Sequence, residues 1–170
     1  MTNLTNSSPQ PVGGSYSWQF KRSSDQSFSS LTTNVSLTTN DELRVSFEAT
    51  DSTDCSVDTS PSPSVKVDGT STTTGITATA TLKQGSTDTY DVVMTYTIQS
   101  SDGGAINDFS ISLTDGSASN SISIPNPTGI TVTADTDAPE LDSNINDPIW
   151  CLSNGTTIEL YFDEDLNSNL

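Results

Sequence analysis

Apolar residues recur at every second position along most of this chain. The clearest run is Leu43, Val45, Phe47 and Ala49, with polar residues at the positions between them. Successive side chains of a β-strand point to opposite faces, so this alternation predicts a strand with one buried face and one wet face. No segment has apolar residues at helical spacing over about ten positions. The chain is therefore predicted to be all-β, with almost no helix.

Turn residues separate the apolar runs about every ten positions, which is typical of a β-sandwich or barrel. Asp68-Gly69 is one such turn signal, and the segment 100–104 is another. About seven strands are predicted between Tyr16 and Val132, the number found in an immunoglobulin-like (Ig-like) antiparallel β-sandwich. The apolar segments behind this prediction are 16–20, 31–37, 43–49, 65–67, 76–82, 90–98, 106–113 and 122–132.

The same signals divide the chain into four parts. Residues 1–14 are polar, with prolines and paired glycines, and are expected to be flexible. The sandwich is predicted over 15–134, an acidic linker over 135–139, and the first strands of a second, incomplete Ig-like module over 140–170. Two strands cannot make an independent sandwich. Three explanations of the tail remain open: a part of a longer protein, an eighth strand of the first sheet, or strand addition between neighbouring subunits.

Charge disfavours several classes of partner. The chain has 22 acidic and 5 basic residues, which gives a formal net charge of −17. Nucleic acid and anionic membrane surfaces would repel it. No stretch of about 20 apolar residues is present, so membrane insertion is not expected. The negative charge also strains the compact state, and a bound divalent cation would relieve that strain.

Catalytic chemistry has few of its usual residues here. The chain has no histidine, which excludes histidine-dependent triads and histidine-ligated zinc. It also lacks the glycine patterns that bind phosphates or dinucleotides. A pair of carboxylates could serve a glycosidase, but short strands offer little wall for the deep cleft of such an enzyme. We expect a protein that is not an enzyme.

The aspartates of the predicted turns are candidate calcium ligands, because calcium prefers carboxylate and carbonyl oxygens on flexible loops. A cation at the junction between modules would fix the angle between them. The competing interpretation is that each aspartate only caps its own turn. In an Ig-like order the candidates form two groups, Asp102, Asp135 and Asp137 at the junction, and Asp51, Asp54 and Asp115 at the opposite end.

Cys55 lies in a predicted loop of the first module and Cys151 lies in the second. A disulfide needs Cα atoms within about 7 Å of each other. An intrachain bond would therefore contradict the two-module interpretation, and free thiols or a bond to a neighbouring subunit are expected. Trp18 and Trp150 are candidate sugar-stacking platforms, although a tryptophan on an alternating strand more often packs in a core.

Two further segments carry a family resemblance. The tail contains Ala138-Pro139-Glu140-Leu141, then Gly155-Thr156-Thr157, and then Phe162-Asp163-Glu164-Asp165-Leu166. This pattern resembles the opening of bacterial Ig-like repeats of large surface proteins, in particular the repeat of cyanobacterial swimming-motility surface proteins. Residues 90–137 resemble the last half of a bacterial Ig-like domain, with a tyrosine strand, an Asp-Gly turn, an Asp-rich turn and an Asp-Thr-x-Ala-Pro linker in that order.

The resemblance implies a module in the array of a long extracellular protein, of the adhesin, surface-layer, motility-associated or virion-fibre type. The expected function is that of a secreted, non-catalytic structural or adhesive module. Ca²⁺ at the junction would stiffen it, and its partners would be neighbouring modules or subunits. Two alternatives remain open: a carbohydrate-binding accessory module that takes cell-surface glycans, and a subunit of a strand-exchanged filament or virion fibre.

Overall fold

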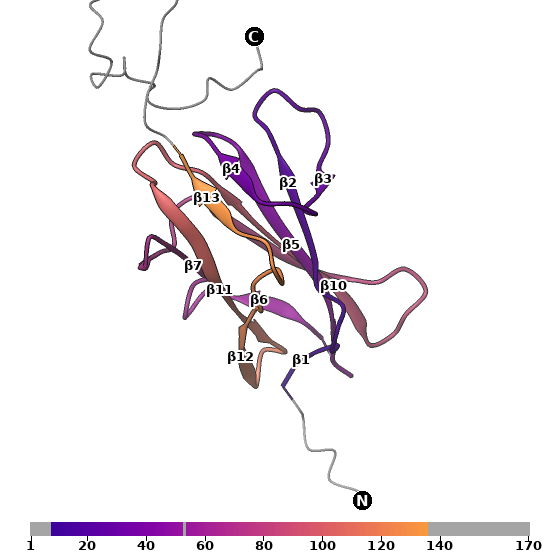
Figure 1. Ribbon diagram of the computed structural model, residues 1–170. Coiled ribbons are helices and arrows are strands. Elements are labelled where there is room, and N and C mark those ends of the chain that lie inside the picture. Colours follow the sequence, from indigo (N-terminus) through magenta and orange to yellow (C-terminus); the bar gives the residue numbers. More distant parts are fainter. Residues whose placement is uncertain (1–7, 53, 136–170) are drawn as a thin grey trace, which may run out of the picture. The chain divides into compact units, whose positions relative to one another are not determined.

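The computed structural model describes residues 8–52 and 54–135, which form two β-sheets and contain no helix (Figure 1). The chain divides into two compact units, 1–136 and 137–170, and all of the described residues belong to the first. The predicted all-β sandwich is thus confirmed for this part of the chain.

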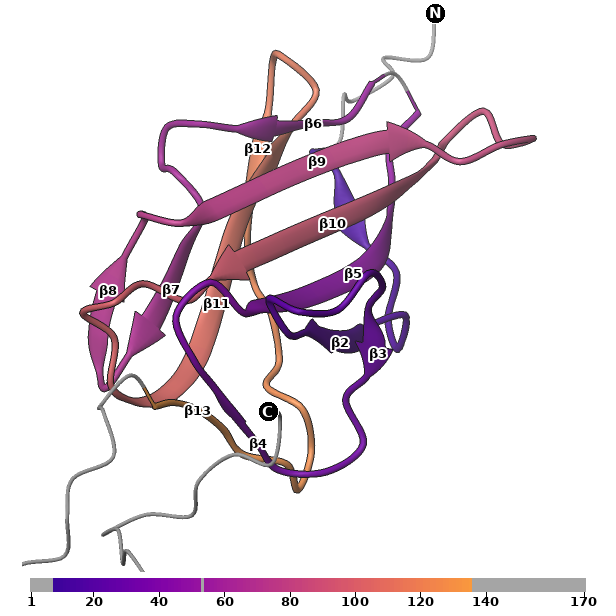
Figure 2. The ribbon, with the colours of Figure 1, turned by 90° about the horizontal axis from the view of Figure 1, so that it is seen from above.

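The first sheet has the strand order β3-β2-β5-β10-β9, and β1 also pairs with β5. All of its pairings are antiparallel, and Figure 2 shows β9, β10 and β5 side by side. Its strands are β1 (Gln10–Pro11), β2 (Ser17–Lys21), β3 (Ser29–Ser30), β5 (Glu42–Thr50), β9 (Ile76–Leu82) and β10 (Thr89–Thr97).

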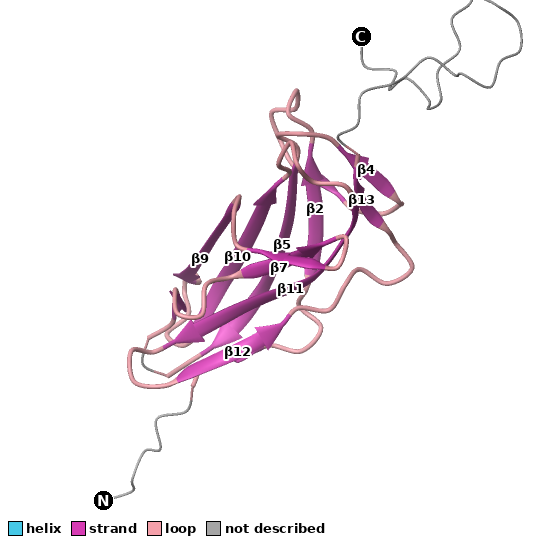
Figure 3. Ribbon diagram, turned by 90° about the vertical axis from the view of Figure 1, so that its left-hand side faces the viewer, coloured by secondary structure: helices cyan, strands magenta, loops and turns pink. Residues whose placement is uncertain are grey.

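The second sheet has the order β4-β13-β11-β7-β8, with β6 and β12 paired to β11 as well. Only the pairing of β13 with β4 is parallel among the described strands. Figure 3 shows β11 flanked by β7 and β12. Its strands are β4 (Val35–Leu37), β6 (Ser56–Asp58), β7 (Ser64–Val67), β8 (Thr70–Thr72), β11 (Gly104–Thr114), β12 (Ser119–Ser123) and β13 (Val132–Ala134).

The core lies between the two sheets and follows the predicted alternation. Along β5 every second side chain from Leu43 to Ala49 is buried, and the intervening polar side chains face outward. A buried aliphatic or aromatic side chain contributes about 1.5–3 kcal/mol to folding. The largest fully buried side chains are Tyr96, Phe109, Leu37, Leu43, Met94, Ile98, Leu113 and Ile124.

β11 departs from strict alternation at one place. Ile106 is buried, but the next inward residue is Phe109 rather than residue 108. The register with β7 shifts between Asn107 and Ser110, and Asp108 has a φ of +50°. A β-bulge of this kind adds one residue to a strand and turns the following side chains to the other face. Beyond the bulge, Phe109 therefore returns to the core.

Trp18 packs into the molecule. Its ring meets Phe109 edge-on, with centroids 5.0 Å apart and an interplanar angle of 85°. Because β2 and β11 belong to different sheets, this contact joins the two layers. Trp18 is partly buried against the core, and this packing leaves it poorly placed as a flat sugar platform. Trp150 lies outside the described residues.

The two ends of the sandwich have different turns. β1 pairs with the end of β5, so the turns 51–55, 83–88 and 115–118 share one end, called here the β1 pole. The β13 pole holds the turns 38–41, 68–69 and 99–103, together with Asp135. The described chain thus enters at one pole and leaves at the other (Figure 1).

Several predicted boundaries differ from the structure. The predicted flexible segment 1–14 contains β1, and Pro9 is buried and accepts a hydrogen bond from Asn120. The short strands β6 and β8 lie where no strand was expected, because three residues give too little alternation to recognise. The predicted strand 122–132 is divided into β12 and β13.

Candidate functional site

A shallow acidic groove opens at the β13 pole, between the turn that joins β7 to β8 and the turn that precedes β11. Its volume is about 540 Å³. Both turns carry an Asp-Gly pair, so aspartates reach the groove from two separate segments. The lining residues are Val67, Asp68, Thr70, Thr72, Ser101, Asp102 and Gly103.

Asp68 is held close to the start of β11. Its φ of +45° is in the left-handed region that aspartate tolerates in turns, and its amide donates to the Ala105 carbonyl at 2.8 Å. A Cβ on Gly104 would lie 3.0 Å from three atoms of the Asp68 side chain. The glycine, with a φ of +86°, therefore lets the carboxylate approach the backbone.

Asp102 closes the turn on the other side of the groove. Its carboxylate accepts hydrogen bonds from the Tyr96 hydroxyl at 2.5 Å and from the Gln99 amide at 2.7 Å. Tyr96 is fully buried. Burial, and then the bond to Asp102, raises the pKa of the Tyr96 phenol far above its ordinary value. Asp102 therefore has a structural role in addition to lining the groove.

Asp135 lies at the same pole as Asp102. Gly104 pairs with Ala134, which places Asp135 one residue further along, beside Gly103. The Asp135 amide donates to the Leu37 carbonyl at 2.8 Å. Two of the three aspartates predicted for the junction are thus brought to one pole, while Asp137 lies outside the described residues.

Asp68 was recognised in the sequence only as a turn signal. An Ig-like strand order, however, puts the turn after β7 at the same end as the turn before β11. That order was the signal that could have added Asp68 to the predicted group.

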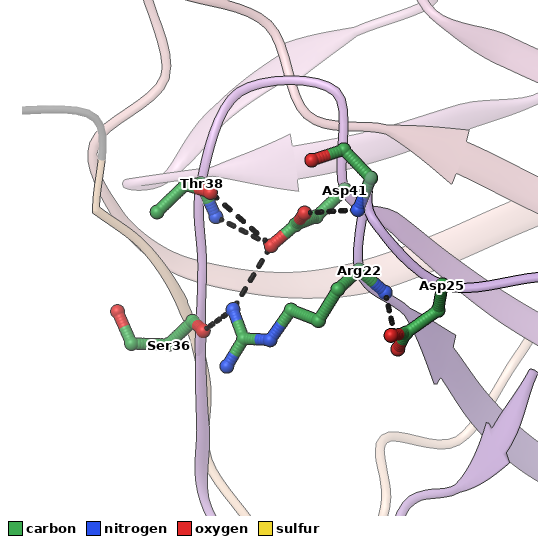
Figure 4. A network of polar contacts seen from close by, with 6 residues as sticks. Arg22, Asp25, Ser36, Thr38 and Asp41 are labelled. Carbon is green, nitrogen blue, oxygen red and sulfur yellow. Dashed lines mark hydrogen bonds and ion pairs between the residues drawn. The ribbon is translucent and has the colours of Figure 1, made fainter. Parts of the chain in front are cut away.

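The β13 pole also has a buried carboxylate, that of Asp41, which was not predicted as a site residue. Asp41 is 1% exposed and accepts hydrogen bonds from the Arg22 guanidinium and the Ser23 and Thr38 amides (Figure 4). Arg22 also donates to the Ser36 carbonyl. The network ties the segment after β2 to the turn before β5. Its closed set of partners suits a structural role.

Two of the three aspartates predicted for the β1 pole, Asp54 and Asp115, are bound within their own turns. Asp54 accepts a hydrogen bond from the Cys55 amide at 2.8 Å. Asp115 accepts bonds from the amides of residues 117 and 118, at 2.7 and 2.6 Å. Asp51 is 4% exposed, and its backbone amide donates to the carbonyl of Asp88 in the turn 83–88. The bonds that Asp115 accepts are those of a turn-capping aspartate.

Asp58, the last residue of β6, makes a contact with β12. It accepts hydrogen bonds from the Ser60 amide and from the Ser119 hydroxyl, both at 2.9 Å. These bonds hold the pKa of the Asp58 carboxyl below its ordinary value, with the Ser60 amide as the larger cause. The end of β6 and the start of β12, two strands that both pair with β11, are therefore joined by a side-chain hydrogen bond.

Cys55 is a free thiol with 3% exposure. Burial raises its pKa to about 11, and the negative charges of Asp51 and Asp54 act in the same direction. A thiol that stays protonated is a poor nucleophile and a poor metal ligand. Cys151, the other cysteine of the chain, lies outside the described residues.

Neither group of carboxylates converges as a finished metal site. Within residues 8–52 and 54–135, no three carboxylates or thiols are grouped so as to hold a metal ion. The β13 pole comes nearest to such a site. Asp68 and Asp102 line one groove there, and Asp135 follows β13 at the same pole.

Comparisons with known proteins give no relative. No family model, no curated protein and no solved structure matches the chain. In the part of the chain that the structure describes, no helix is long and apolar enough to cross a membrane.

Proposed function

We propose that this chain is a non-catalytic, Ig-like module of an extracellular surface protein, in which it serves a structural or adhesive role in a linear array. Calcium at the β13 pole would stiffen the junction with the segment that follows. The observation that carries the proposal is the placement of β1 and β13 at opposite poles. Modules joined head to tail need this placement, because each must receive the chain at one end and pass it on at the other.

The strand order supports the Ig-like part of the proposal. An Ig sandwich has the order A-B-E-D in one sheet and, in its variable form, G-F-C-C′ in the other. The first sheet here contains β2-β5-β10-β9, and the second contains β12-β11-β7-β8. Assigned in chain order, these strands match the two Ig sheets one for one. Ig-like sandwiches occur in many cell-surface proteins, although fold alone does not fix function.

Three features support a cation at the β13 pole. Asp68 and Asp102 line one groove, Asp135 lies at the same pole, after the strand β13 that pairs with β11, and Asp137 follows two residues later in the sequence. The net charge of −17 also makes neutralisation at such a pole favourable. Calcium accepts six to eight oxygen ligands in flexible geometry, so hydroxyl and carbonyl oxygens of the groove would complete its shell.

A calcium titration tests the cation. Isothermal calorimetry and thermal melts with Ca²⁺ or with EDTA should show saturable binding and a higher melting temperature with Ca²⁺. Asp68→Asn and Asp135→Asn should each weaken binding. Asp91→Asn makes the same charge change on the exposed face of β10, near the β1 pole and away from the groove. It should leave calcium binding unchanged. Identical melting in Ca²⁺ and EDTA would remove the cation from the proposal.

Surface labelling tests the module itself. An antibody raised against the chain should label intact cells or particles of the source, with permeabilised cells as the control. Label that appears only after permeabilisation would overturn the extracellular assignment, whatever the calcium result.

A further inference from the structure

Four of the five cationic side chains are neutralised within the chain. Lys21 pairs with Glu42 at 2.6 Å, Arg22 with Asp41 at 2.9 Å, Lys66 with Asp108 at 2.9 Å, and Lys83 with Glu48. Arg44 makes no ion pair with any described residue. Acidic residues far outnumber basic ones in this chain, so an arginine with no carboxylate partner among the described residues calls for a physical explanation.

Arg44 is held flat on the outer face of the first sheet. It lies on β5 between the inward residues Leu43 and Val45, so its side chain points away from the core. The Phe28 ring covers the guanidinium, with the ring centroid 3.4 Å from the Arg44 Cζ. Arg44 Nε donates to the Thr95 hydroxyl at 3.4 Å. This cation–π contact fixes the plane of the guanidinium, and one face of it stays turned from the ring.

The strand register extends this position into a row of polar side chains. Gln19 pairs with Arg44, Arg44 with Thr95, and Thr95 with Thr77. Thr95 itself is buried, so the polar groups of the row that a ligand can reach, apart from Arg44, belong to Gln19 and Thr77. Paired residues on four adjacent strands stand about 4.8 Å apart, so the row is about 14 Å long. That length matches two to three sugar rings.

A hollow lies next to this row on the same face. Its volume is about 590 Å³, and Ser46, one step along β5 on the Arg44 side, is part of its lining. Ser15, Glu48 and Asp91 also line it, and Val93 is the apolar side chain of the outer face there. Hydroxyl and carboxylate groups together both donate and accept hydrogen bonds, as a neutral sugar requires. Glu48 is paired with Lys83, so the Asp91 carboxylate is the group that would repel a second acidic sugar.

We propose that the outer face of the first sheet binds a glycan with one carboxylate-bearing sugar next to neutral sugars. Arg44 grips the carboxylate, since a guanidinium donates two parallel hydrogen bonds that match its geometry. The Gln19 amide and the Thr77 hydroxyl hold that sugar, and the hollow takes the neutral one. The inference rests on the proposed function and deepens it by naming a ligand class for its adhesive role.

A protein partner fits this face less well. A second copy of the chain would bring another charge of −17, and the two copies would repel each other. The same net charge acts against an acidic glycan only at long range, where salt screens it over about 8 Å. At hydrogen-bond distance the attraction between the Arg44 guanidinium and the carboxylate of the sugar outweighs the repulsion by the net charge.

The experiment titrates the full chain with defined oligosaccharides and follows backbone amide NMR shifts. The probes are 3′-sialyllactose, which has one acidic sugar on a neutral disaccharide, lactose, which lacks the acidic sugar, and trigalacturonic acid, which has three. We expect 3′-sialyllactose to shift the amides of Gln19, Arg44, Thr77 and Thr95 at up to about 10 mM ligand. Lactose and trigalacturonic acid should bind at least about 10-fold more weakly.

Variants separate the guanidinium from general charge. Arg44→Gln should lower the affinity for 3′-sialyllactose by about 10-fold or more, since a hydrogen bond to a charged group is lost. Arg44→Lys keeps the charge but loses the fork, and should also weaken binding. Lys66→Gln removes one charge from β7 in the other sheet and should leave the affinity unchanged. The amide spectrum of each variant reports whether it is folded.

The outcomes are decisive in both directions. Selective binding of 3′-sialyllactose that Arg44→Gln weakens and Lys66→Gln does not would support the proposal. Absence of amide shifts with 3′-sialyllactose, or equal binding of lactose or trigalacturonic acid, would overturn it. The array proposal stands apart from this result, because surface labelling and calcium binding do not involve Arg44.

Discussion

The Arg22 guanidinium lies 2.9 Å from the Asp41 carboxylate, which is 1% exposed. The Ser23 amide at 2.7 Å and the Thr38 amide at 3.0 Å donate to the same carboxylate. A buried charge is tolerated when it is both paired and hydrogen-bonded. Here one carboxylate fastens two turns and an arginine at the β13 pole.

Asp41→Asn should therefore destabilise the fold strongly. The amide side chain would place N–H groups against donors and leave the Arg22 charge without its partner, at a cost of about 3 kcal/mol. Urea denaturation would measure the decrease in the free energy of unfolding, with the dependence on urea concentration (the m-value) expected to stay unchanged. Asp25→Asn is the matched control, since Asp25 is exposed and accepts a single bond from the Arg22 amide. Equal urea midpoints for the two variants would contradict the assignment of Asp41 as the anchor.

Tyr96→Phe tests the hydrogen bond that the Tyr96 hydroxyl donates to the Asp102 carboxylate. The ring stays packed, while the hydrogen bond to a charged acceptor is lost, so a decrease of about 1.5–3 kcal/mol in unfolding free energy is expected. Tyr16→Phe is the control, because burial alone raises the pKa of Tyr16. It should cost less than about 0.5 kcal/mol.

The difference between wild type and Tyr96→Phe should depend on pH. The folded pKa of Tyr96 is raised above its ordinary value of about 10. Below about pH 10 both states keep the phenol proton, so the stabilisation is fully present; at higher pH the unfolded chain loses the proton first, and the stabilisation falls. The stability gap should thus narrow above about pH 10. A gap that stays constant in alkaline urea titrations would show that the phenol has an ordinary pKa.

Two glycines with similar dihedrals offer a test of close packing at the β13 pole. Gly75 and Gly85 have φ values of +76° and +85°, but a Cβ on Gly75 would lie 2.7 Å from the Thr97 carbonyl oxygen, whereas one on Gly85 would meet nothing within 4 Å. Gly85→Ala should cost about 1 kcal/mol from backbone strain. Gly75→Ala should cost at least about 2 kcal/mol more, from the clash. Thermal melts that rank the two variants equally would refute this.

Cys55 should resist alkylation in the folded protein. Its burial and its pKa of about 11 keep the thiolate scarce near neutral pH. Brief treatment with iodoacetamide, followed by peptide mass spectrometry, should find Cys55 labelled in urea and largely unlabelled without it. The peptide-level readout separates Cys55 from Cys151. Rapid labelling of Cys55 in native buffer would mean that its turn opens readily.

The strands could be predicted because each long one pairs a buried face with a wet face. The run from Leu43 to Ala49 in β5 shows this pattern fully. β9 alternates half-buried with exposed residues over most of its length, and β10 follows the pattern as far as Met94. β11 was predicted at nearly its true bounds although its bulge at Asn107 shifts the alternation. The short strand β6 has three residues and depends on its partner β11, so local sequence carries no sign of it.

The site was only partly predictable, for a similar reason. Asp102 and Asp135 could be placed at one pole because strand order alone determines it. The burial of Asp41, in contrast, depends on Arg22, which is 19 residues away in sequence. The stacking of Arg44 on Phe28 depends on how the segment before β3 folds back over the sheet. Neither contact leaves a periodic or motif-like trace.

The opposite placement of β1 and β13 also has a mechanical consequence. Tension applied between the two poles acts along the strands. It would slide β13 lengthwise past its two neighbours, the parallel strand β4 and the antiparallel strand β11. Hydrogen bonds loaded in this direction share the force and must break together, whereas bonds at a peeled edge break one at a time. The pairing of β13 with β4 would then resist unfolding under shear. Its paired residues are Val132 with Val35, Thr133 with Ser36 and Ala134 with Leu37.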